Sequence, residues 1–250
     1  MWWQLALQQV WSSSLTEVMI ESILLDNPAW AALNRTQRQF SIGTDHAKRY
    51  RRGILPFAAC AGGSAGSLET LDSFTAAGES LYIMGDQLPL LPAAWKITLE
   101  LPCAQLWLNK EVASLPVDLP GMSTVVRLGE TDRREMYELV NQVQPGYYDI
   151  DTPLLGRYVG IRKDGKLVAM AGERMRLTGF SELSAICTLP GYTGKGYAQQ
   201  LISALSHTHA RSKERSFLHV AISNERAIRL YQHMGFEQRR TIIFRKLTRP

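Results

Sequence analysis

The chain has 250 residues, enough for one large domain or two modest ones, and its 45% apolar and 20% charged composition is that of an ordinary soluble globular protein. The formal net charge is +5, the Lys and Arg residues are dispersed along most of the chain, and no basic stripe is interleaved with aromatic residues. We therefore expect no nucleic-acid partner. One basic cluster, at residues 48–52, is either a solvated surface or a contact for an acidic ligand or partner.

The cysteines and the apolar runs indicate the compartment. Cys60, Cys103 and Cys187 are widely spaced and form no Cys-x-x-Cys pair, which suits a reducing environment. The first residues have no basic region before an apolar run, and no apolar run approaches the length of a membrane span. We expect a cytoplasmic protein with no membrane partner, acting as a monomer or a homodimer.

The first half of the chain predicts a divergent α/β domain over residues 1–120. Gly62–Gly66 follows a strand and precedes a helix, but it lacks the Lys-Ser/Thr of a phosphate-binding P-loop and is better explained as a flexible turn. Pro116 and Pro120 mark a linker. The elements predicted in this half are helices at residues 30–40 and 67–77 and strands at residues 56–60, 81–84 and 96–108.

The second half, residues 121–250, is more regular. Asp132 and Glu135 form a capping-box pattern at the start of a helix, and Asp164-Gly165 is a strong hairpin signal. The remaining pattern predicts strands at residues 124–128, 158–162, 167–176, 182–189, 217–223 and 241–247, and helices at residues 195–211 and 225–234. The fold class is therefore α/β, with a mixed central sheet flanked by helices.

A glycine-bearing turn joins the strand at residues 182–189 to the following helix. Gly194 and Gly196 allow the backbone to approach a ligand closely, and the helix behind them offers unpaired N–H groups and the positive end of its dipole. This combination suits a pyrophosphate, although a Gly-x-Gly turn by itself also occurs as a purely structural connection.

Two linked segments carry a resemblance to a known family. The loop Gly194–Ala198 and the segment Asn224–Phe236 together resemble the GNAT N-acetyltransferase superfamily, over roughly residue 124 to the C-terminus. Ala169–Arg174 and Leu218–Val220 resemble the glycine N-acyltransferase-like branch. The resemblance implies a GNAT-like fold with a mostly antiparallel sheet for residues 121–250, and it leaves open that residues 1–120 are a degenerate GNAT-like unit. It also implies transfer of an acetyl group from acetyl-CoA to a primary amine, on a small-molecule or peptide acceptor, without a metal.

The same resemblance assigns residues to the acetyl-CoA site. The family usually carries Gln or Arg where this chain has Gly191 and Thr193, a departure that predicts weaker binding of CoA, which Lys195 offsets in part. The residues assigned to acetyl-CoA lie at a strand end, in the glycine loop and at the next helix: Ile186, Cys187, Thr188, Thr193, Gly194, Lys195, Gly196, Tyr197, Ala198, Asn224 and Ala227.

Tyr231 matches the family tyrosine that protonates the departing thiolate, although it also falls on an apolar helix stripe where a core aromatic would sit. Glu182 and Glu173 are the candidate general bases, with an ordered water as the alternative, because the strand register that decides which face each presents is not readable from sequence. His219 is expected to be a hydrogen-bonded interior residue. His207 and His209 face different ways on a helix, so no metal site is expected.

Three functions remain open at this point. The main prediction is an N-acetyltransferase that works by direct transfer, because no activated nucleophile is evident and Cys187 is better explained as a small buried residue. A non-catalytic acyl-CoA-binding regulator and a nucleotide-binding module are the alternatives.

Overall fold

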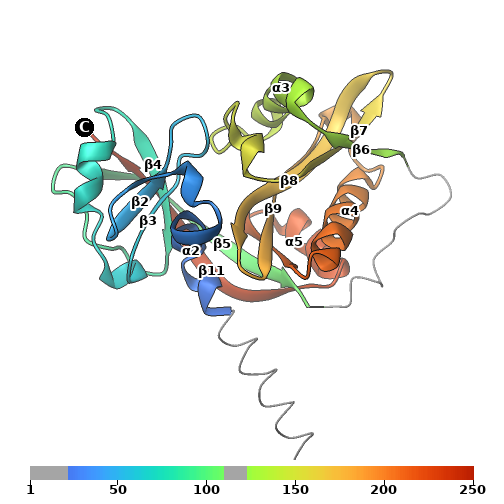
Figure 1. Ribbon diagram of the computed structural model, residues 1–250. Coiled ribbons are helices and arrows are strands. Elements are labelled where there is room, and N and C mark those ends of the chain that lie inside the picture. Colours follow the sequence, from blue (N-terminus) through green and yellow to red (C-terminus); the bar gives the residue numbers. More distant parts are fainter. Residues whose placement is uncertain (1–21, 110–122) are drawn as a thin grey trace, which may run out of the picture.

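The computed structural model describes residues 22–109 and 123–250. The predictions for the first residues of the chain and for the linker at Pro116 and Pro120 lie outside these ranges. Two sheets organise the described residues: a small antiparallel sheet with the order β1-β2-β3, and an eight-stranded sheet with the order β4-β11-β5-β10-β9-β8-β7-β6 (Figure 1). No described helix is long and apolar enough to cross a membrane.

Nine of the described strands lie at the predicted runs, although the last of them begins five residues earlier than predicted, and the strands at residues 41–43 and 47–50 were not predicted. The small sheet consists of β1 (Ser41–Gly43), β2 (Ala47–Tyr50) and β3 (Ala58–Cys60). The large sheet consists of β4 (Ser80–Gly85), β5 (Lys96–Leu108), β6 (Val125–Leu128), β7 (Tyr158–Lys163), β8 (Lys166–Leu177), β9 (Phe180–Thr188), β10 (Arg215–Ala221) and β11 (Phe236–Thr248).

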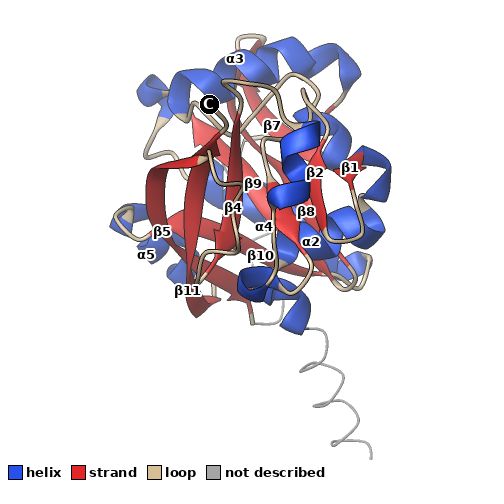
Figure 2. Cartoon of the chain, turned by 90° about the vertical axis from the view of Figure 1, so that its left-hand side faces the viewer, coloured by secondary structure: helices blue, strands red, loops and turns tan. Residues whose placement is uncertain are grey.

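Among the described residues, the longer helices belong to the second half of the chain. They are α3 (Arg133–Val143), α4 (Tyr197–Arg211) and α5 (Glu225–His233), whereas the first half has only the short α2 (Pro28–Ala31) among its described residues, followed by a π-helical turn, Ala32–Thr36. The helix predicted at residues 67–77 is instead a 3-10 helix, Glu69–Phe74. In Figures 1 and 2 the helices lie around the large sheet, with α3 and α4 on opposite sides of β8 and β9.

The β7–β8 hairpin forms where its sequence predicts. Asp164 and Gly165 both have positive φ, of 51° and 77°, as a two-residue turn between twisted strands requires.

The predicted capping box at the start of α3 is wrong. The Asp132 carboxylate accepts from the backbone N–H of Gly129 at 2.8 Å, and the Glu135 carboxylate accepts from the N–H of Leu167 at 2.7 Å. Both acids also pair with Arg162, at 2.7 and 2.8 Å, so a neighbouring strand draws them away from the helix. The local pattern predicted the start of the helix correctly, but tertiary contacts direct the Asp132 and Glu135 side chains to other partners.

The large sheet opens between β9 and β10. These parallel strands pair only at their first residues, Phe180–Glu182 with Arg215–Phe217. Ala185 follows on β9 with a φ of 50°, beside a register shift against β8 that marks a bulge. Beyond this point the backbones of β9 and β10 are unpaired with each other, and a gap in the sheet is available for a ligand.

The large sheet also crosses the predicted domain boundary at residue 120. β5, from the first half, lies between β10 and β11 and pairs antiparallel with both. β4 pairs with the outer side of β11. The division into 1–120 and 121–250 stays a prediction, but the two segments share one sheet. The fold class itself, α/β with a mostly antiparallel sheet flanked by helices, is confirmed.

Candidate active site

Two cavities occupy the opening between β9 and β10. The first, which we call the loop cavity, has a volume of about 450 Å³ and lies against the glycine loop. Its walls include most of the residues assigned to acetyl-CoA from the sequence: Ile186, Cys187, Thr188, Thr193, Gly194, Gly196, Tyr197, Ala198, Asn224 and Ala227. Residues from β9, α4, α5 and the loop before α4 therefore line one cavity, and their assignment to acetyl-CoA stays a prediction.

The glycine loop has the geometry of an anion cradle. Gly194 and Gly196 have φ values of 79° and 74°, in the left-handed region that favours glycine, and a Cβ on Gly194 would meet nothing within 4 Å. α4 begins at Tyr197 behind Gly196, which has no side chain to cap the first turn. The first N–H groups of a helix have no partner within the helix, so the residues at this helix start fit the pyrophosphate of an acyl-CoA.

Of the two basic residues near this loop, Arg226 lines the loop cavity and Lys195 does not. Lys195 does not face the loop cavity: its ammonium lies over the Tyr192 ring, 5.1 Å from the centroid. Arg226, which the sequence reasoning passed over, is the one formally charged side chain among the described residues that line the cavity. The sequence signal that could have identified Arg226 as a cavity residue is its position two residues after Asn224, inside the segment that carries the family resemblance.

The second cavity, which we call the inner cavity, has a volume of about 330 Å³. It lies on the other side of the opening, between the end of α3, the segment 144–152, and strands β5, β8, β9, β10 and β11. Its polar walls come from Gln144, Tyr147, Tyr148, Thr152, Arg174, Ser184, His219, Asn224 and Tyr231.

The two cavities meet. They share four lining residues, which are Gln144, Ile186, Asn224 and Tyr231. Asn224 also caps α5, because its Oδ1 accepts from the N–H of Ala227 at 3.2 Å, so the capping and lining roles coexist.

Tyr231 lies on α5 at this junction and is only 8% exposed. Its ring packs edge-on against Phe236, with the centroids 6.0 Å apart. Burial raises the pKa of Tyr231 to about 12, so the hydroxyl keeps its proton at neutral pH. The core position and the acid role that the sequence left open are compatible with each other here.

Glu182 lies behind the wall of the inner cavity. It is fully buried, and its carboxylate accepts from Nε of Arg174 at 2.9 Å and from Nδ1 of His219 at 2.7 Å. Burial alone would raise the pKa of Glu182, but Arg174 and His219 outweigh it and hold the pKa at about 2. Such a carboxylate stays ionised, but it is a weak base at neutral pH.

His219 is held between two partners, as expected for an interior histidine. Because ionised Glu182 only accepts, the proton of neutral His219 lies on Nδ1, and Nε2 accepts from Nε2 of Gln105 at 3.0 Å. Both ring nitrogens are engaged, so His219 has no free lone pair toward the inner cavity.

Glu173 does not reach either cavity. Side chains alternate along β8, so Glu173 faces α4 while the adjacent Arg174 faces the inner cavity. The Glu173 carboxylate is fully buried and accepts from Nε2 of His209 at 2.9 Å and from the N–H of Arg157 at 3.0 Å. Burial would raise the pKa of Glu173, but these contacts lower it. This position gives no support to the base role predicted for Glu173.

Both cavities contain a buried thiol. Cys187 lines the loop cavity and Cys103 the inner cavity. Burial raises the pKa of Cys187 to about 12 and that of Cys103 to about 11, so both remain thiols at neutral pH. Within residues 22–109 and 123–250, no group of three or more His, Cys, Asp or Glu side chains is placed to hold a metal ion.

Comparisons with known proteins agree with this geometry. The FR47-like protein family model matches residues 158–244, from β7 into β11. A crystal structure of a GNAT-family protein from Novosphingobium aromaticivorans is 33% identical, covers 90% of this chain and 98% of its own, and superposes with a TM-score of 0.80. A GCN5-related N-acetyltransferase from Kribbella flavida shares the fold at 16% identity, covering 88% of this chain and 93% of its own with a TM-score of 0.59.

A search of curated proteins finds no significant match. The Novosphingobium aromaticivorans structure spans almost its whole length in the alignment, at an identity high enough to establish kinship. The chain belongs to the GNAT family, and it is an acyltransferase of that family.

Proposed function

We propose that this protein transfers an acetyl group from acetyl-CoA to the primary amine of a small acceptor by direct transfer. The observation that carries the proposal is the pair of cavities that meet at Tyr231 in the opening between β9 and β10. One cavity has the anion cradle at its mouth, and the other is a separate space for an acceptor.

The loop cavity is the proposed site of acetyl-CoA, which supplies the thioester whose acetyl group is transferred. The N-terminal amides of α4 and the loop at Gly194 and Gly196 bind the pyrophosphate. Arg226 adds a positive charge at the same cavity, which compensates for the missing basic residues at Gly191 and Thr193. The strand end at Ile186–Thr188 lies along the pantetheine arm.

In the transfer, the amine nitrogen forms a bond to the thioester carbonyl carbon, the carbon–sulfur bond breaks, and sulfur takes up a proton. We assign that proton donation to Tyr231, whose hydroxyl is protonated at neutral pH. Direct transfer is favoured over an acetylated enzyme because Cys187 and Cys103 both remain thiols.

The proton lost by the amine needs a different route from the one predicted. Glu182 is occupied by Arg174 and His219, and its pKa of about 2 leaves it little affinity for a proton. We propose that water carries this proton away, and that Glu182 instead fixes the orientation of Arg174 and His219.

Calorimetry with acetyl-CoA, CoA and ATP tests the proposal. We expect acetyl-CoA and CoA to bind and ATP not to bind; binding of ATP alone would favour a nucleotide-binding module. A panel of amines with a thiol-release assay then separates a catalyst from a regulator, because a protein that binds acetyl-CoA without releasing thiol on any amine is not the enzyme proposed. The glycine N-acyltransferase-like branch, the cytoplasmic location and a monomeric or homodimeric state remain predictions from the sequence.

A further inference from the structure

Gln144 lies where the two cavities meet. It lines both the loop cavity and the inner cavity, together with Ile186, Asn224 and Tyr231. With acetyl-CoA in the loop cavity and the acceptor in the inner cavity, the new carbon–nitrogen bond forms at this junction. The side chains of the four shared residues are therefore placed to touch the reacting atoms.

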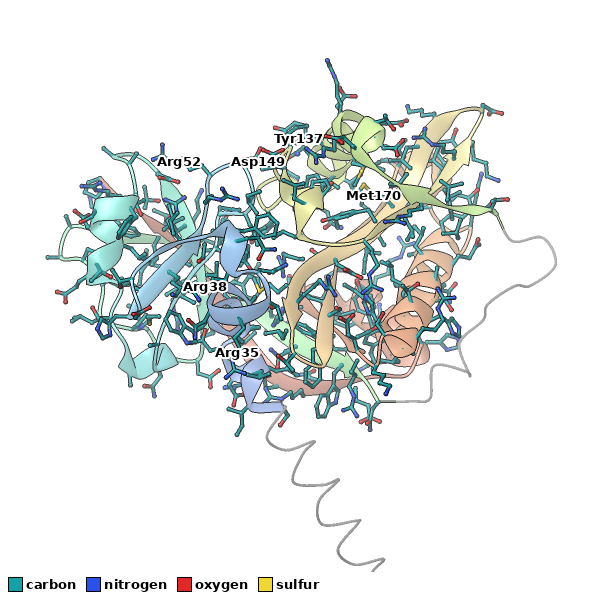
Figure 3. The ribbon with its side chains drawn as sticks, in the orientation of Figure 1. Arg35, Arg38, Arg52, Tyr137, Asp149 and Met170 are labelled. Atoms are coloured by element: carbon teal, nitrogen blue, oxygen red, sulfur yellow. The ribbon has the colours of Figure 1, made fainter. Side chains whose placement is uncertain are left out.

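The opening of the sheet brings Gln144 to this place. β9 and β10 pair only up to Glu182 and Phe217, and Ala185 bends β9 with its φ of 50°. Ile186 comes next, where β9 has no pairing with β10, and its carbonyl is reached by the side chain of Gln144 instead. Gln144 directly follows the last residue of α3, in the stretch of chain between Tyr137 and Asp149 that Figure 3 labels.

A hydrogen bond fixes the orientation of the Gln144 amide. Its Nε2 donates to the carbonyl oxygen of Ile186 at 2.9 Å. Because a carbonyl only accepts, the amide nitrogen faces Ile186 and the acceptor oxygen, Oε1, takes no part in this bond. The Ile186 carbonyl has a second lone pair, so the bond to Gln144 does not close it to acetyl-CoA.

Oε1 of Gln144 is an acceptor without a donor. Among the described residues, none donates a hydrogen bond to it, and the side chain is exposed, so a ligand can reach it. Nε2 and Oε1 belong to one planar group, so Oε1 lies at the same junction. The Oδ1 of Asn224 is already bonded to the N–H of Ala227, and the Tyr231 hydroxyl is assigned to the departing sulfur.

An attacking amine needs an acceptor of this kind. It attacks as the free base, with its lone pair directed at the thioester carbonyl carbon, so only its N–H groups remain for the protein to hold. No described residue with a carboxylate lines either cavity. An amide oxygen accepts a hydrogen bond without taking up the proton, so it can orient the amine while water removes the proton.

We propose that Gln144 is a catalytic residue of the acetyl transfer, whose Oε1 accepts an N–H of the attacking amine. This bond directs the nitrogen lone pair at the thioester carbonyl carbon. The carbon–nitrogen bond then forms and the carbon–sulfur bond breaks, the sulfur takes a proton from Tyr231, and the proton of the amine leaves to water, which reprotonates Tyr231. This role rests on the proposed function and adds to it the residue that orients the acceptor.

Gln144→Met tests the role, because it keeps the length of the side chain and removes both polar ends of the amide. With an amine that the wild type acetylates, we expect kcat to fall about 10-fold, the effect of one hydrogen bond lost from the transition state. The dissociation constant of acetyl-CoA, measured by calorimetry, should stay within about 2-fold.

Gln238→Met is the matched control. Gln238 is also exposed and also donates through Nε2, to Oγ1 of Thr241 at 3.4 Å, but it lines neither cavity. This variant should keep the kcat of the wild type.

Gln144→Glu separates the two ends of the amide. It keeps oxygen acceptors at this position and loses the N–H group that binds the Ile186 carbonyl. If the acceptor orients the amine, this variant retains more of the wild-type kcat than Gln144→Met does. Equal losses in the two variants would mean that only the bond to Ile186 matters, and would overturn the role of Oε1. A loss of acetyl-CoA affinity as large as the loss of kcat would overturn it too.

The same assays separate the role of Gln144 from the proposed function. Thiol release by the wild type, together with an unchanged kcat in Gln144→Met, removes Gln144 from the mechanism and leaves the proposed function standing. A wild type that binds acetyl-CoA and releases no thiol with any amine overturns both.

Discussion

Tyr231 lies in the wall of both cavities, on the helix whose sequence first suggested its role. Burial holds its hydroxyl in the protonated form, and the same burial packs its ring against Phe236. Tyr231 can therefore be a core residue and a proton donor at once, because the packing that holds its ring in place also holds its hydroxyl in one position.

Tyr231→Phe should therefore lower kcat by about 100-fold, the lower end of what a general acid contributes, while the dissociation constant of acetyl-CoA stays within about 2-fold. Steady-state kinetics with a responsive amine and calorimetry check the two quantities. Tyr137→Phe, at an exposed site on α3 that lines neither cavity, is the control. An unchanged kcat in the Tyr231 variant would exclude the acid role.

Glu182 also makes the stability of the protein depend on acid. Its pKa is lowered from 4.5 to about 2 in the folded state, so its ionised form contributes stability that is fully present above pH 4.5 and is lost as the pH falls toward 2. The shift corresponds to about 3 kcal/mol. Glu173, whose pKa is also lowered, adds to the loss in the same direction.

Denaturant titrations from pH 7 to pH 2.5 should show this decline in the free energy of unfolding. Glu182→Gln should cost about 3–5 kcal/mol at pH 7, because it leaves Arg174 buried without its partner, and should flatten the decline below pH 4.5. Glu225→Gln, in an exposed pair with Arg229, should change stability by less than about 0.5 kcal/mol. A parallel pH dependence in wild type and Glu182→Gln would contradict the assignment.

At the scale of elements, the glycine loop and the helix α4 behave as one unit. The positive φ values of Gly194 and Gly196 turn the chain at the start of α4, and residues 196–199 line the loop cavity. Because a helix N-terminus binds phosphate through backbone N–H groups, the proposed acetyl-CoA site does not depend on the side chains at Gly191 and Thr193, where the family usually has longer polar residues.

Gly194→Ala tests this unit, and the chain provides a matched control. Gly194 and Gly165 have nearly equal φ values of 79° and 77°, and a Cβ on either meets nothing within 4 Å. Both alanine variants should lose about 1–2 kcal/mol of stability from backbone strain. Only Gly194→Ala should weaken acetyl-CoA binding, by about 10-fold, because Gly165 lies in the β7–β8 hairpin away from the loop cavity. Equal affinities in the two variants would show that the cradle is not at Gly194.

At the scale of the whole molecule, the two halves of the chain share one sheet. β5 contributes Ala104, Leu106 and Leu108 to the core that the second half builds around α3 and α4. It also satisfies the hydrogen bonds of β10 on one side and of β11 on the other. Without it, both strands would present unpaired backbone groups and an open face of the core.

A fragment of residues 121–250 should therefore fail to fold alone, although it contains the whole segment that resembles the family. We expect it to unfold without a cooperative transition by circular dichroism and to be cleaved rapidly by protease, while the full chain unfolds cooperatively. A fragment that melts cooperatively near the temperature of the full chain would establish residues 121–250 as an independent domain.

Local patterns in the sequence determined most of the secondary structure and the loop cavity. The two positive-φ positions of the β7–β8 turn, the glycine loop before α4 and the Asn224 cap of α5 are all specified by a few adjacent residues. Their predictions succeeded because backbone conformation and capping are short-range effects. Most of the residues assigned to acetyl-CoA lie in the same local structures and line the loop cavity, and their contact with the cofactor stays a prediction.

Only the tertiary structure decided which residues line the inner cavity, the proposed site of the acceptor. The faces of Glu173 and Glu182 depend on strand register, which places one under α4 and the other behind Arg174. The inner cavity joins Tyr148 to Arg174 and Cys103, residues far apart in the chain, and β5 enters the sheet between β10 and β11. Such contacts are set by packing between distant segments, which no local pattern encodes, so the sequence determined the glycine loop and the helix behind it, and the fold determined which side chains face the cavities beside them.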